Sequence, residues 1–329
     1  MRLRRADPAR AGYGRRRRGR GFSYVDERGA ALVDPQEVRR CRELAIPPAW
    51  RDVWICPDPA GHLQATGIDA AGRRQYLYHP QWRVRREQRK FAHVLQIAPH
   101  LSRLRRRVAA DLRGDEVSRE WVLALAVRLI DRGLFRVGND QYANDDDPTF
   151  GVATLQCGHV RCAGPRTVRF RYRAKGGIER ILSIQDPDVV AAVRRLKRFR
   201  RGSVRLLAYR DADRGWREIH ARDINGYLRR TTGADLTAKD LRTWHATVAA
   251  AVALARAEPP GSPTAARRCV ARVMRQVAAD LGNTPAVARA SYVDPRVVEL
   301  FLRGRTIDLP RWCRSDGPRA ERAVLELLA

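Results

Sequence analysis

The sequence changes its pattern near residue 90, and this change limits the folds that the chain can adopt. From Phe22 to about Trp82, short apolar runs alternate with turn-forming residues, a pattern typical of short strands. Two of these runs, Val53–Ile55 and Gln75–Tyr78, predict strands. From about Phe91 onward, apolar residues recur at helical spacing instead. The sequence therefore predicts an α+β fold with a small β-rich N-terminal domain and a larger, mostly α-helical domain.

Two helices of the larger domain are predicted by their apolar positions, one over residues 101–112 and one over residues 122–130. The charged stretch Arg83–His93 is compatible with a helical connector between the domains. Within the helical region, apolar and basic residues alternate over 168–173, and an Ala-Lys-Gly-Gly turn at 174–177 follows. This predicts a short β-hairpin with one apolar and one basic face. Lys175 shares the parity of the arginines, so we expect it at the hairpin tip on the basic side.

Length and composition exclude several classes of protein. The 329 residues suit two domains of ordinary size, each with its own core. The longest apolar run, near Ala246–Ala255, is too short to cross a bilayer, and no apolar leader follows the first residue. The Cys residues, at 41, 56, 157, 162, 269 and 313, are scattered and form no disulfide framework. The sequence predicts a reduced, soluble, intracellular protein.

The charge indicates a polyanionic partner. The chain has 65 Lys+Arg and 36 Asp+Glu, a net charge of +29, of which +11 lies at or before Lys90 and +18 after it. Because both parts are basic, DNA or RNA contacted by both is the simplest partner; a solvated basic surface without a specific ligand is the alternative. Only four of these cations are Lys, at 90, 175, 197 and 239, and the others are Arg, so a Lys at a given position can reflect a chemical requirement that Arg does not meet.

The first 21 residues are the most biased segment of the chain. They are rich in Arg, with Gly at 12, 14, 19 and 21. Such a segment is typical of a disordered basic arm that contacts phosphates without reading sequence. The predicted organisation is an arm over 1–21, a β-rich domain over 22–90 and a helical domain over 91–329.

Residues 278–295 carry a helix-ending signal followed by a helix-starting signal. Gly282-Asn283 ends one helix, Thr284 can cap the next, and Pro285 suits its first position. Tyr292 then falls at the end of a short helix. A tyrosine in such a place is ordinarily a packing residue, so its neighbours have to decide whether it does more.

The run from Leu281 to Pro295, Leu-Gly-Asn-Thr-Pro-Ala-Val-Ala-Arg-Ala-Ser-Tyr-Val-Asp-Pro, resembles the nucleophile segment of type IB DNA topoisomerases, specifically the short bacterial and poxvirus-like group. Further stretches agree in the same order, namely residues 46–67, 75–80, 135–160 and 238–244. The resemblance covers roughly residues 22–300 and implies that the helical domain is a catalytic, tyrosine-transesterase domain.

The resemblance assigns Tyr292 as a nucleophile that attacks a DNA phosphodiester, forms a 3′-phosphotyrosyl link and releases a 5′-hydroxyl. Exchange of one phosphoester for another requires little energy, so neither ATP nor a metal cofactor is expected. The nicked strand would swivel about the intact one and be resealed. A phenol has a pKa near 10, so cationic surroundings have to assist it at neutral pH.

The same resemblance assigns the other catalytic positions. Arg136 and Arg242 match arginines that bind the non-bridging oxygens of the scissile phosphate, where planar forks of donors suit the developing charge. Lys175 matches the general acid, a role that Arg cannot fill because its pKa is too high. Lys239 is an auxiliary candidate for proton transfer or phosphate binding. Asn283 stands where poxvirus and nuclear members have His, so we expect it to bind phosphate but not to titrate.

In the N-terminal domain, the resemblance implies that Gln75, Tyr76 and Tyr78 form a Gln–Tyr face that enters the DNA major groove. Double-stranded DNA is the expected partner, and the family precedent favours a monomer. A cytoplasmic, nucleoid-associated location in a bacterium is the corresponding expectation. Two possible metal sites are set aside. The spacing of Cys157, His159 and Cys162 falls short of a zinc site, and 145–147 suits a turn better than Mg²⁺.

Two alternatives remain open. A tyrosine recombinase shares the order Arg, Lys, Arg, Tyr, although recombinases prefer a His shortly before the second Arg and commonly have a helical N-terminal domain. A non-catalytic basic DNA-binding protein explains the charge but not the catalytic series. Relaxation of supercoiled plasmid in EDTA without ATP separates the three.

Overall fold

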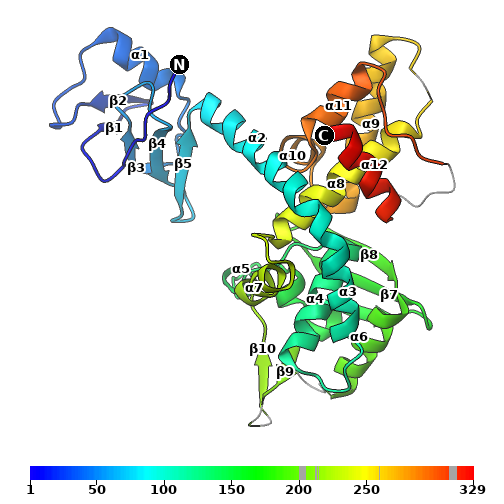
Figure 1. Ribbon diagram of the computed structural model, residues 1–329. Coiled ribbons are helices and arrows are strands. Elements are labelled where there is room, and N and C mark those ends of the chain that lie inside the picture. Colours follow the sequence, from blue (N-terminus) through cyan, green and yellow to red (C-terminus); the bar gives the residue numbers. More distant parts are fainter. Residues whose placement is uncertain (200–204, 212, 214, 259, 311–316) are drawn as a thin grey trace. The chain divides into compact units, whose positions relative to one another are not determined.

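The structure is a computed structural model that describes residues 1–199, 205–211, 213, 215–258, 260–310 and 317–329 (Figure 1). The chain forms two compact units, Met1–Lys90 and Phe91–Ala329. Helix α2 (Pro80–Ile97) carries the chain from the first unit into the second. The α+β class is confirmed, because the first unit is built around a β-sheet and the second is mainly helical.

The N-terminal unit contains a five-stranded antiparallel sheet in the order β2-β1-β3-β4-β5. The strands are β1 (Tyr13–Arg18), β2 (Gly21–Val25), β3 (Arg51–Ile55), β4 (Leu63–Ile68) and β5 (Arg74–Tyr78). Strands β3 and β5 confirm the two predicted strands. Helix α1 (Pro35–Glu43) was not expected from the sequence; Asp34 caps it and Pro35 opens it. It buries Cys41 in a small core with Tyr24, Ile46, Val53, Ile55 and Ala65.

The prediction of a disordered arm over 1–21 is wrong for residues 13–18, which form strand β1 between β2 and β3. Gly12 allows a close approach rather than flexibility, because a Cβ there would lie 2.2 Å from Nε1 of Trp54. The Arg15 side chain donates to the carbonyl oxygens of Ile46, Pro47 and Trp50 at 2.7–3.0 Å. Arg15 of this Arg-rich segment is thus structural, because its guanidinium binds three main-chain carbonyls that precede β3.

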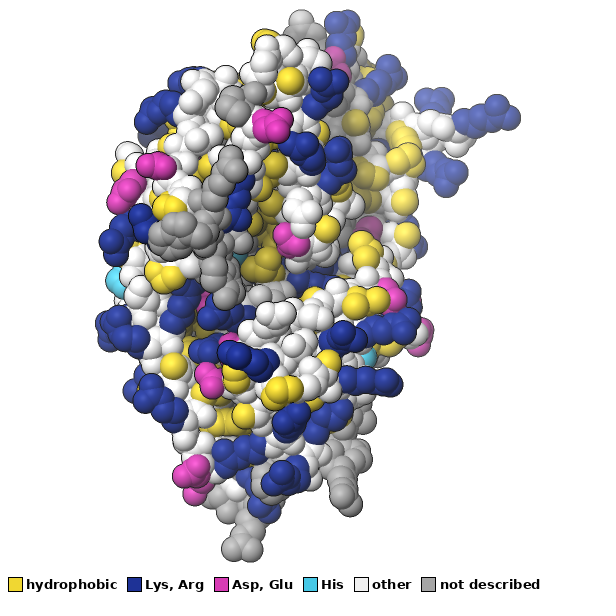
Figure 2. Space-filling view, turned by 90° about the vertical axis from the view of Figure 1, so that its right-hand side faces the viewer, with side chains coloured by type: hydrophobic (Ala, Val, Ile, Leu, Met, Phe, Trp, Pro, Cys, Tyr) yellow, Lys and Arg dark blue, Asp and Glu magenta, His cyan; other side chains and the backbone are white. Residues whose placement is uncertain are grey.

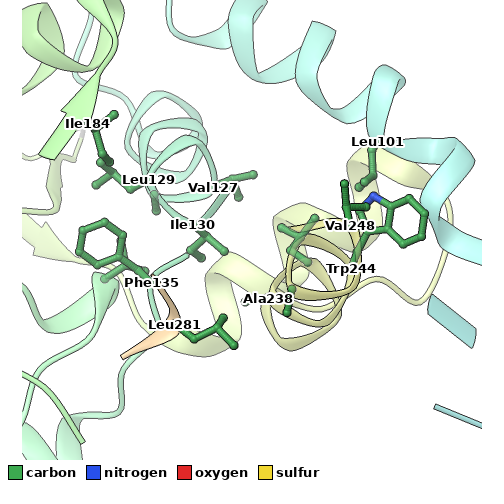
Figure 3. Close-up of a cluster of buried hydrophobic side chains, with 14 of the residues drawn as sticks. Leu101, Val127, Leu129, Ile130, Phe135, Ile184, Ala238, Trp244, Val248 and Leu281 are labelled. Atoms are coloured by element: carbon green, nitrogen blue, oxygen red, sulfur yellow. The ribbon is translucent and has the colours of Figure 1, made fainter. Parts of the chain in front are cut away.

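The larger unit consists mainly of helices. They are α3 (Leu101–Asp111), α4 (Arg119–Gly133), α5 (Asp140–Ala143), α6 (Pro187–Phe199), α7 (Ala221–Thr232), α8 (Ala238–Ala255), α9 (Pro263–Leu281), α10 (Pro285–Ser291), α11 (Pro295–Leu302) and α12 (Pro318–Leu328). Helices α3 and α4 confirm the two predicted from apolar periodicity. Helix α4 lies in the middle of the core, and Val122–Ala126 have no exposed surface. Figure 3 shows side chains from α3, α4 and α8 in this core, together with Phe135 and Leu281, which lie next to the candidate site.

Two small sheets complete the larger unit. One has the order β6-β7-β8, with β6 (Val160–Cys162), β7 (Thr167–Arg173) and β8 (Glu179–Gln185); the other pairs β9 (Ala208–Arg210) with β10 (Trp216–Glu218). The predicted hairpin is confirmed as β7–β8, since Val168, Phe170 and Tyr172 are buried and the arginines between them are exposed. Arg180 pairs with Tyr172 across the hairpin, so this arginine lies on the buried face.

Basic side chains are distributed widely over the surface. Figure 2 shows Lys and Arg over the whole visible face, with few acidic side chains among them. Within the described part of the chain, no helix combines the length and the apolar character that a membrane span requires.

Candidate active site

Three arginines from separate elements converge on the C-terminal end of helix α9. Arg180 of β8 donates to the carbonyl oxygen of Asp280 at 2.8 Å, and Arg242 of α8 donates to that of Leu281 at 3.1 Å. Arg136, which follows α4, donates to that of Gly282 at 3.1 Å. Carbonyls at a helix C-terminus lack intrahelical partners and carry partial negative charge, so they attract cations.

Helix α9 ends at this point because Gly282 adopts a left-handed conformation with φ +62. The backbone N–H of Asn283 then returns to the carbonyl oxygen of Ala278 at 2.9 Å. Thr284 caps α10 through the N–H of Val287, and Pro285 occupies its first position. These predicted signals are confirmed, and they place Asn283 between two helices with its Oδ1 accepting a hydrogen bond from Nη2 of Arg136.

Tyr292 follows the last residue of α10 and is fixed by both its backbone and its ring. Its N–H donates to the carbonyl oxygen of Ala288 at 3.0 Å. The Thr247 hydroxyl on α8 lies 3.3 Å from the carbonyl oxygen of Tyr292 and accepts from the N–H of Asp294 at 3.1 Å. The guanidinium carbon of Arg242 lies 5.2 Å from the centre of the Tyr292 ring. Helix α8 therefore holds the tyrosine at two points.

The electrostatic surroundings favour the ionised form of this phenol. Burial raises the pKa of Tyr292, but the positive charges of Arg242, Arg136 and Lys239 outweigh burial, and the net effect lowers the pKa. Burial in turn lowers the pKa of Arg242, whose side chain has only 2% of its surface exposed. The phenol and the guanidinium thus stabilise each other's charged forms.

Several buried donors at this site find no hydrogen-bond partner among the described residues. They are Nη1 of Arg136, Nε and Nη1 of Arg242 and Nδ2 of Asn283. A buried unsatisfied donor costs about 1–3 kcal/mol, so proteins retain such groups where a ligand pairs with them. Two guanidinium forks and an amide beside a phenol are suited to a phosphate group.

The loop that carries Arg136 is held by a close contact between two glycines. Helix α4 ends at Gly133, and Leu134 reverses the chain with φ +52. The carbonyl oxygen of Arg136 accepts from the N–H of Val152 at 2.8 Å. A Cβ on Gly151 would lie 2.4 Å from the backbone nitrogen of Gly138. Only glycine lets the 151–154 turn approach closely enough to support Arg136.

The two candidate lysines lie in different environments. Lys175 is exposed at the tip of the β7–β8 hairpin, where Gly176 and Gly177 take positive φ values. The contacts of the described residues include none that joins its amine to the arginine cluster. Lys239, in the first turn of α8, is also exposed, but its charge acts on Tyr292. The hairpin position of Lys175 is as predicted, whereas its approach to the tyrosine stays a prediction.

The three N-terminal candidates do not share one face of β5. Tyr76 and Tyr78 lie on the same side, with ring centres 6.2 Å apart and planes inclined by 18°. Gln75 has the opposite parity, and its amide donates to Asp69 Oδ2 at 2.8 Å. Tyr76 is 48% exposed and available to a partner. The expectation of a single Gln–Tyr face is therefore wrong, because side chains alternate along a strand.

Two residues of the site were missed by the sequence analysis. Arg180 was one arginine among many, yet the hairpin pattern contained a signal, because its parity places a charge on the apolar face. Thr247 carries no signal in the sequence, since a threonine in a helix is ordinarily unremarked. In the structure, these two residues connect the elements that carry Arg136, Asn283 and Tyr292.

The two sequence clusters set aside as metal sites have other contacts. His159 Nδ1 accepts from the N–H of Gln156 at 3.1 Å, and its ring lies edge-on to Phe150 at 4.5 Å. Burial lowers the pKa of His159. Asp147 forms an ion pair with Arg173. Among the residues that the structure describes, no group of three or more potential ligands could hold a metal ion.

Comparison with known proteins identifies the family. Residues 79–299, well over half of the chain, match the family described as "Eukaryotic DNA topoisomerase I, catalytic core". Residues 21–69 match "Bacterial DNA topoisomerase IB, N-terminal domain". The chain belongs to the type IB DNA topoisomerase family. The protein is accordingly a DNA topoisomerase, an isomerase, and the first of the two matched ranges contains Arg136, Lys175, Arg242, Asn283 and Tyr292.

Individual relatives agree with this family. DNA topoisomerase 1B of Acanthamoeba polyphaga mimivirus is 26% identical over 294 residues, which cover 87% of this chain and 86% of the viral topoisomerase. DNA topoisomerase 1 beta of Arabidopsis thaliana is 26% identical over 163 residues, 49% of this chain and 16% of the plant protein. DNA topoisomerase 1 of Mycosarcoma maydis is 28% identical over 123 residues, 36% of this chain and 12% of the fungal protein. The chain thus aligns with a small part of the plant and fungal topoisomerases.

Proposed function

We propose that this topoisomerase nicks one strand of duplex DNA through a covalent link to Tyr292. The phenol releases its proton to the solvent and its oxygen attacks the phosphorus; a new oxygen–phosphorus bond forms to the 3′ side, and the bond to the 5′ oxygen breaks. A proton moves to the departing 5′ oxygen, so that a 5′-hydroxyl leaves. The observation that carries the proposal is the cluster of Arg136, Arg242 and Asn283 donor atoms that have no partner among the described residues, beside a phenol of lowered pKa.

The arginine donors act on the phosphoryl oxygens. Negative charge grows on these oxygens as the phosphorus becomes five-coordinate, and fixed guanidinium groups in a buried site stabilise that charge without reorganisation. Arg242 is held by α8 and by the carbonyl of Leu281, whereas Arg136 is held by Gly282 and Asn283. The Asn283 amide turns its Nδ2 away from Arg136 and can donate to the phosphate, but it exchanges no proton.

The departing oxygen requires a proton donor. We assign that role to Lys175, because its amine is exposed at a hairpin tip that a bound phosphate can approach and a lysine can release its proton. Lys239 is the auxiliary candidate, since its charge already acts on Tyr292. Tyr76 and Tyr78 present a paired aromatic surface for a DNA groove, and Gln75 has to leave Asp69 before it can contact a base.

The free nicked strand then rotates about the intact strand, which relaxes supercoils, and reversal of the chemistry reseals the nick. Because the two phosphoesters are nearly equal in energy, the proposed cycle consumes no ATP. The arginines supply the charge stabilisation, so the cycle uses no metal. We further propose that the protein acts as a monomer on the DNA of a bacterial cytoplasm, in the nucleoid.

The decisive experiment compares the parent protein with Tyr292→Phe on supercoiled plasmid and on labelled duplex, in EDTA and without ATP. The parent is expected to relax plasmid of any sequence and to form an adduct that survives denaturing gels. The variant is expected to do neither while binding DNA almost as tightly, because phosphate contacts set the affinity. A persistent adduct in the variant would move the nucleophile elsewhere, with Tyr227 and Tyr209 as the next candidates.

The same experiment tests the alternatives. A tyrosine recombinase would form the adduct only on duplexes that contain its own site. A non-catalytic DNA-binding protein would form no adduct and leave the plasmid supercoiled.

A further inference from the structure

Arg180 is a charged side chain buried at the centre of the candidate site, with 6% of its surface exposed. We propose that Arg180 is a positioning residue that fixes Arg136 and Asn283 relative to each other and so sets the rate of the covalent step. This inference rests on the function proposed above, because it assigns a role within that reaction.

The contacts of Arg180 join the two segments that carry these residues. Its Nη2 donates to the carbonyl oxygens of Gly133 at 2.7 Å and Asp280 at 2.8 Å. Its Nη1 donates to the carbonyl oxygen of Leu134 at 3.1 Å. Gly133 and Leu134 end helix α4, two residues before Arg136 in the chain, and Asp280 lies three residues before Asn283. One guanidinium therefore connects the C-terminal ends of α4 and α9.

Arg180 also attaches the hairpin to these helix ends. Its Nη1 lies 3.3 Å from the hydroxyl of Tyr172, the residue that faces it in the β7–β8 register. Its guanidinium carbon lies 5.4 Å from the centre of the Phe135 ring, directly before Arg136. The aliphatic part packs against Gly282, where an added Cβ would lie 3.3 Å from Cδ of Arg180.

The hydrogen bonding of Arg180 differs from that of the two arginines assigned to phosphate. Both Nη atoms of Arg180 are occupied by protein acceptors. Arg136 and Arg242 each retain buried donors with no partner among the described residues. Arg180 thus has the geometry of a support and not of a phosphate ligand. Partial negative charge at two helix C-termini explains why a buried cation is stable between them.

The test is a double-mutant cycle on the single-turnover rate of covalent adduct formation with labelled duplex. Arg180→Gln is too short to reach both helix ends, so we expect the rate to fall by about 10²-fold, as for a small displacement of a catalytic group. The rate of Arg136→Ala is expected to fall by at least the same factor. If Arg180 acts by positioning Arg136 and Asn283, the double variant loses less than the product of the two single losses, because Arg136→Ala already removes one of the groups that Arg180 positions. Multiplicative losses in the cycle would overturn the proposal, as would a parental rate in Arg180→Gln.

A second substrate distinguishes positioning from general destabilisation. A methylphosphonate at the cleavage site replaces one charged non-bridging oxygen with a neutral methyl group, so it needs less arginine stabilisation. The defects of Arg136→Ala and Arg180→Gln should shrink together on this substrate. A defect of Arg180→Gln that is equally large on both substrates contradicts an effect through Arg136.

The matched control is Arg128→Gln, which removes a half-buried arginine that binds Asp186 and Asp188 away from the site. It should lower the melting temperature but leave the cleavage rate at the parental value. Arg180→Lys keeps the charge and provides a folded variant should Arg180→Gln fail to fold. Its cleavage rate is expected to lie between those of the parent and Arg180→Gln, and its loss should again be less than multiplicative with that of Arg136→Ala. An adduct absent from the parent itself would refute the proposed function, whereas a parental adduct with multiplicative losses would refute only the role of Arg180.

Discussion

The Tyr292 phenol shows how three cations can overcome the effect of burial on one side chain. Burial favours the neutral phenol, yet Arg242, Arg136 and Lys239 together lower its pKa. Arg242 contributes most because it is itself buried and lies against the ring. Lys239 is exposed, so its contribution is more strongly screened by water. This difference leads to a test that separates the cations.

Lys239→Ala removes one positive charge that stabilises the phenolate, so the pKa of Tyr292 should rise. The rate of cleavage rises with pH as the phenol ionises, and this rising limb of the profile should therefore move to higher pH. Single-turnover rates measured from pH 6 to pH 10 with parent and variant give the comparison. Arg229→Gln, an exposed cation on α7 that pairs with Asp235, is the control and should leave the limb in place. An unchanged limb in Lys239→Ala would assign Lys239 to phosphate binding alone.

Lys175→Arg preserves the charge at the hairpin tip but removes a usable proton, because guanidinium stays protonated at any working pH. If Lys175 is the general acid, cleavage should slow by about 10²–10⁴-fold. A substrate with sulfur in place of the leaving 5′ oxygen needs no proton, since a thiolate departs readily. Lys175→Arg and Lys175→Ala should cleave this substrate nearly as fast as the parent.

Arg136→Ala and Arg242→Ala are the matched comparisons for the sulfur substrate. They serve the phosphoryl oxygens, so they should stay slow on it. If sulfur rescues none of the Lys175 variants, the general acid lies elsewhere and Lys239 becomes the better candidate.

At the scale of elements, strand β1 changes how the N-terminus has to be tested. Residues 1–11 contact the sheet through Arg4, whose N–H and carbonyl pair with Ala60 and His62, and through the carbonyl oxygen of Arg10, which accepts from Trp54 Nε1. Residues 13–18, in contrast, form a strand between two others. A single deletion over both segments would confuse loss of charge with loss of a strand.

Deletion of residues 1–11 is expected to leave the sheet folded, with a small decrease in melting temperature. Deletion of residues 1–18 removes β1, so β2 and β3 lose their common neighbour and the N-terminal unit should unfold. Amide exchange at Tyr24 and Ile55 would report this, with slow exchange in the first variant and fast exchange in the second. Slow exchange in both variants would show that the sheet does not depend on β1.

A buried ion network joins four helices of the larger unit. Asp131 of α4 accepts from His245 of α8 at 2.8 Å and from Arg105 of α3 at 3.0 Å, and Arg105 also binds Glu321 of α12 at 2.7 Å. Burial raises the pKa of Asp131, but the hydrogen bond from His245 and the charge of Arg105 outweigh it and hold the pKa well below its usual range. The network ties α12 to the helix that carries Arg242.

The lowered pKa of Asp131 predicts an acid-sensitive contribution to stability. Its stabilisation is fully present above the unfolded pKa of about 4 and is lost as pH falls toward the folded value. Asp131→Asn should cost about 1–3 kcal/mol at pH 7, because a neutral amide replaces the carboxylate that His245 and Arg105 share, while Glu321 still pairs with Arg105. The variant should also lose stability less steeply than the parent below pH 4. Urea unfolding at pH 3–7 measures both effects, with the exposed Asp188→Asn as control; parallel acid limbs would contradict the assignment.

At the scale of the whole molecule, the sequence predicts those features that depend on local patterns. The hairpin follows from the alternation over 168–173, and the end of α9 follows from Gly282 and Thr284. Strand β1 was not predictable, because its arginines and glycines match a flexible arm, and only the fold brings Arg15 to the main-chain carbonyls that precede β3. Thr247 was not predictable for a related reason, because it contacts main-chain atoms of a distant segment, whereas the parity of Arg180 in the hairpin did place a charge on the apolar face. The two faces of β5 were predictable, because Gln75 differs in strand parity from Tyr76 and Tyr78.

The net charge predicts a steep salt dependence of DNA binding. Log affinity should fall linearly with log salt, with a slope of about −0.9 per phosphate contact. Deletion of residues 1–11 removes Arg2, Arg4, Arg5 and Arg10, so the slope should become shallower by about 0.9 for each of them that binds phosphate. Cleavage by the deleted form should persist. An unchanged slope would mean that these arginines do not contact DNA.

The arrangement at the end of α9 affects how freely this segment can diverge among relatives. Arg180, Arg242 and Arg136 bind the main-chain carbonyls of residues 280–282, and every amino acid presents the same carbonyl. The Asp280 side chain is not the group that these arginines bind, so a change there keeps the three hydrogen bonds and removes only its charge near Arg180 and its hydrogen bond with Gln276. Gly282 cannot vary as easily, since its φ of +62 disfavours other residues. Relatives that differ at position 280 can thus assemble the same chemistry, and searches keyed to that side chain would overlook them.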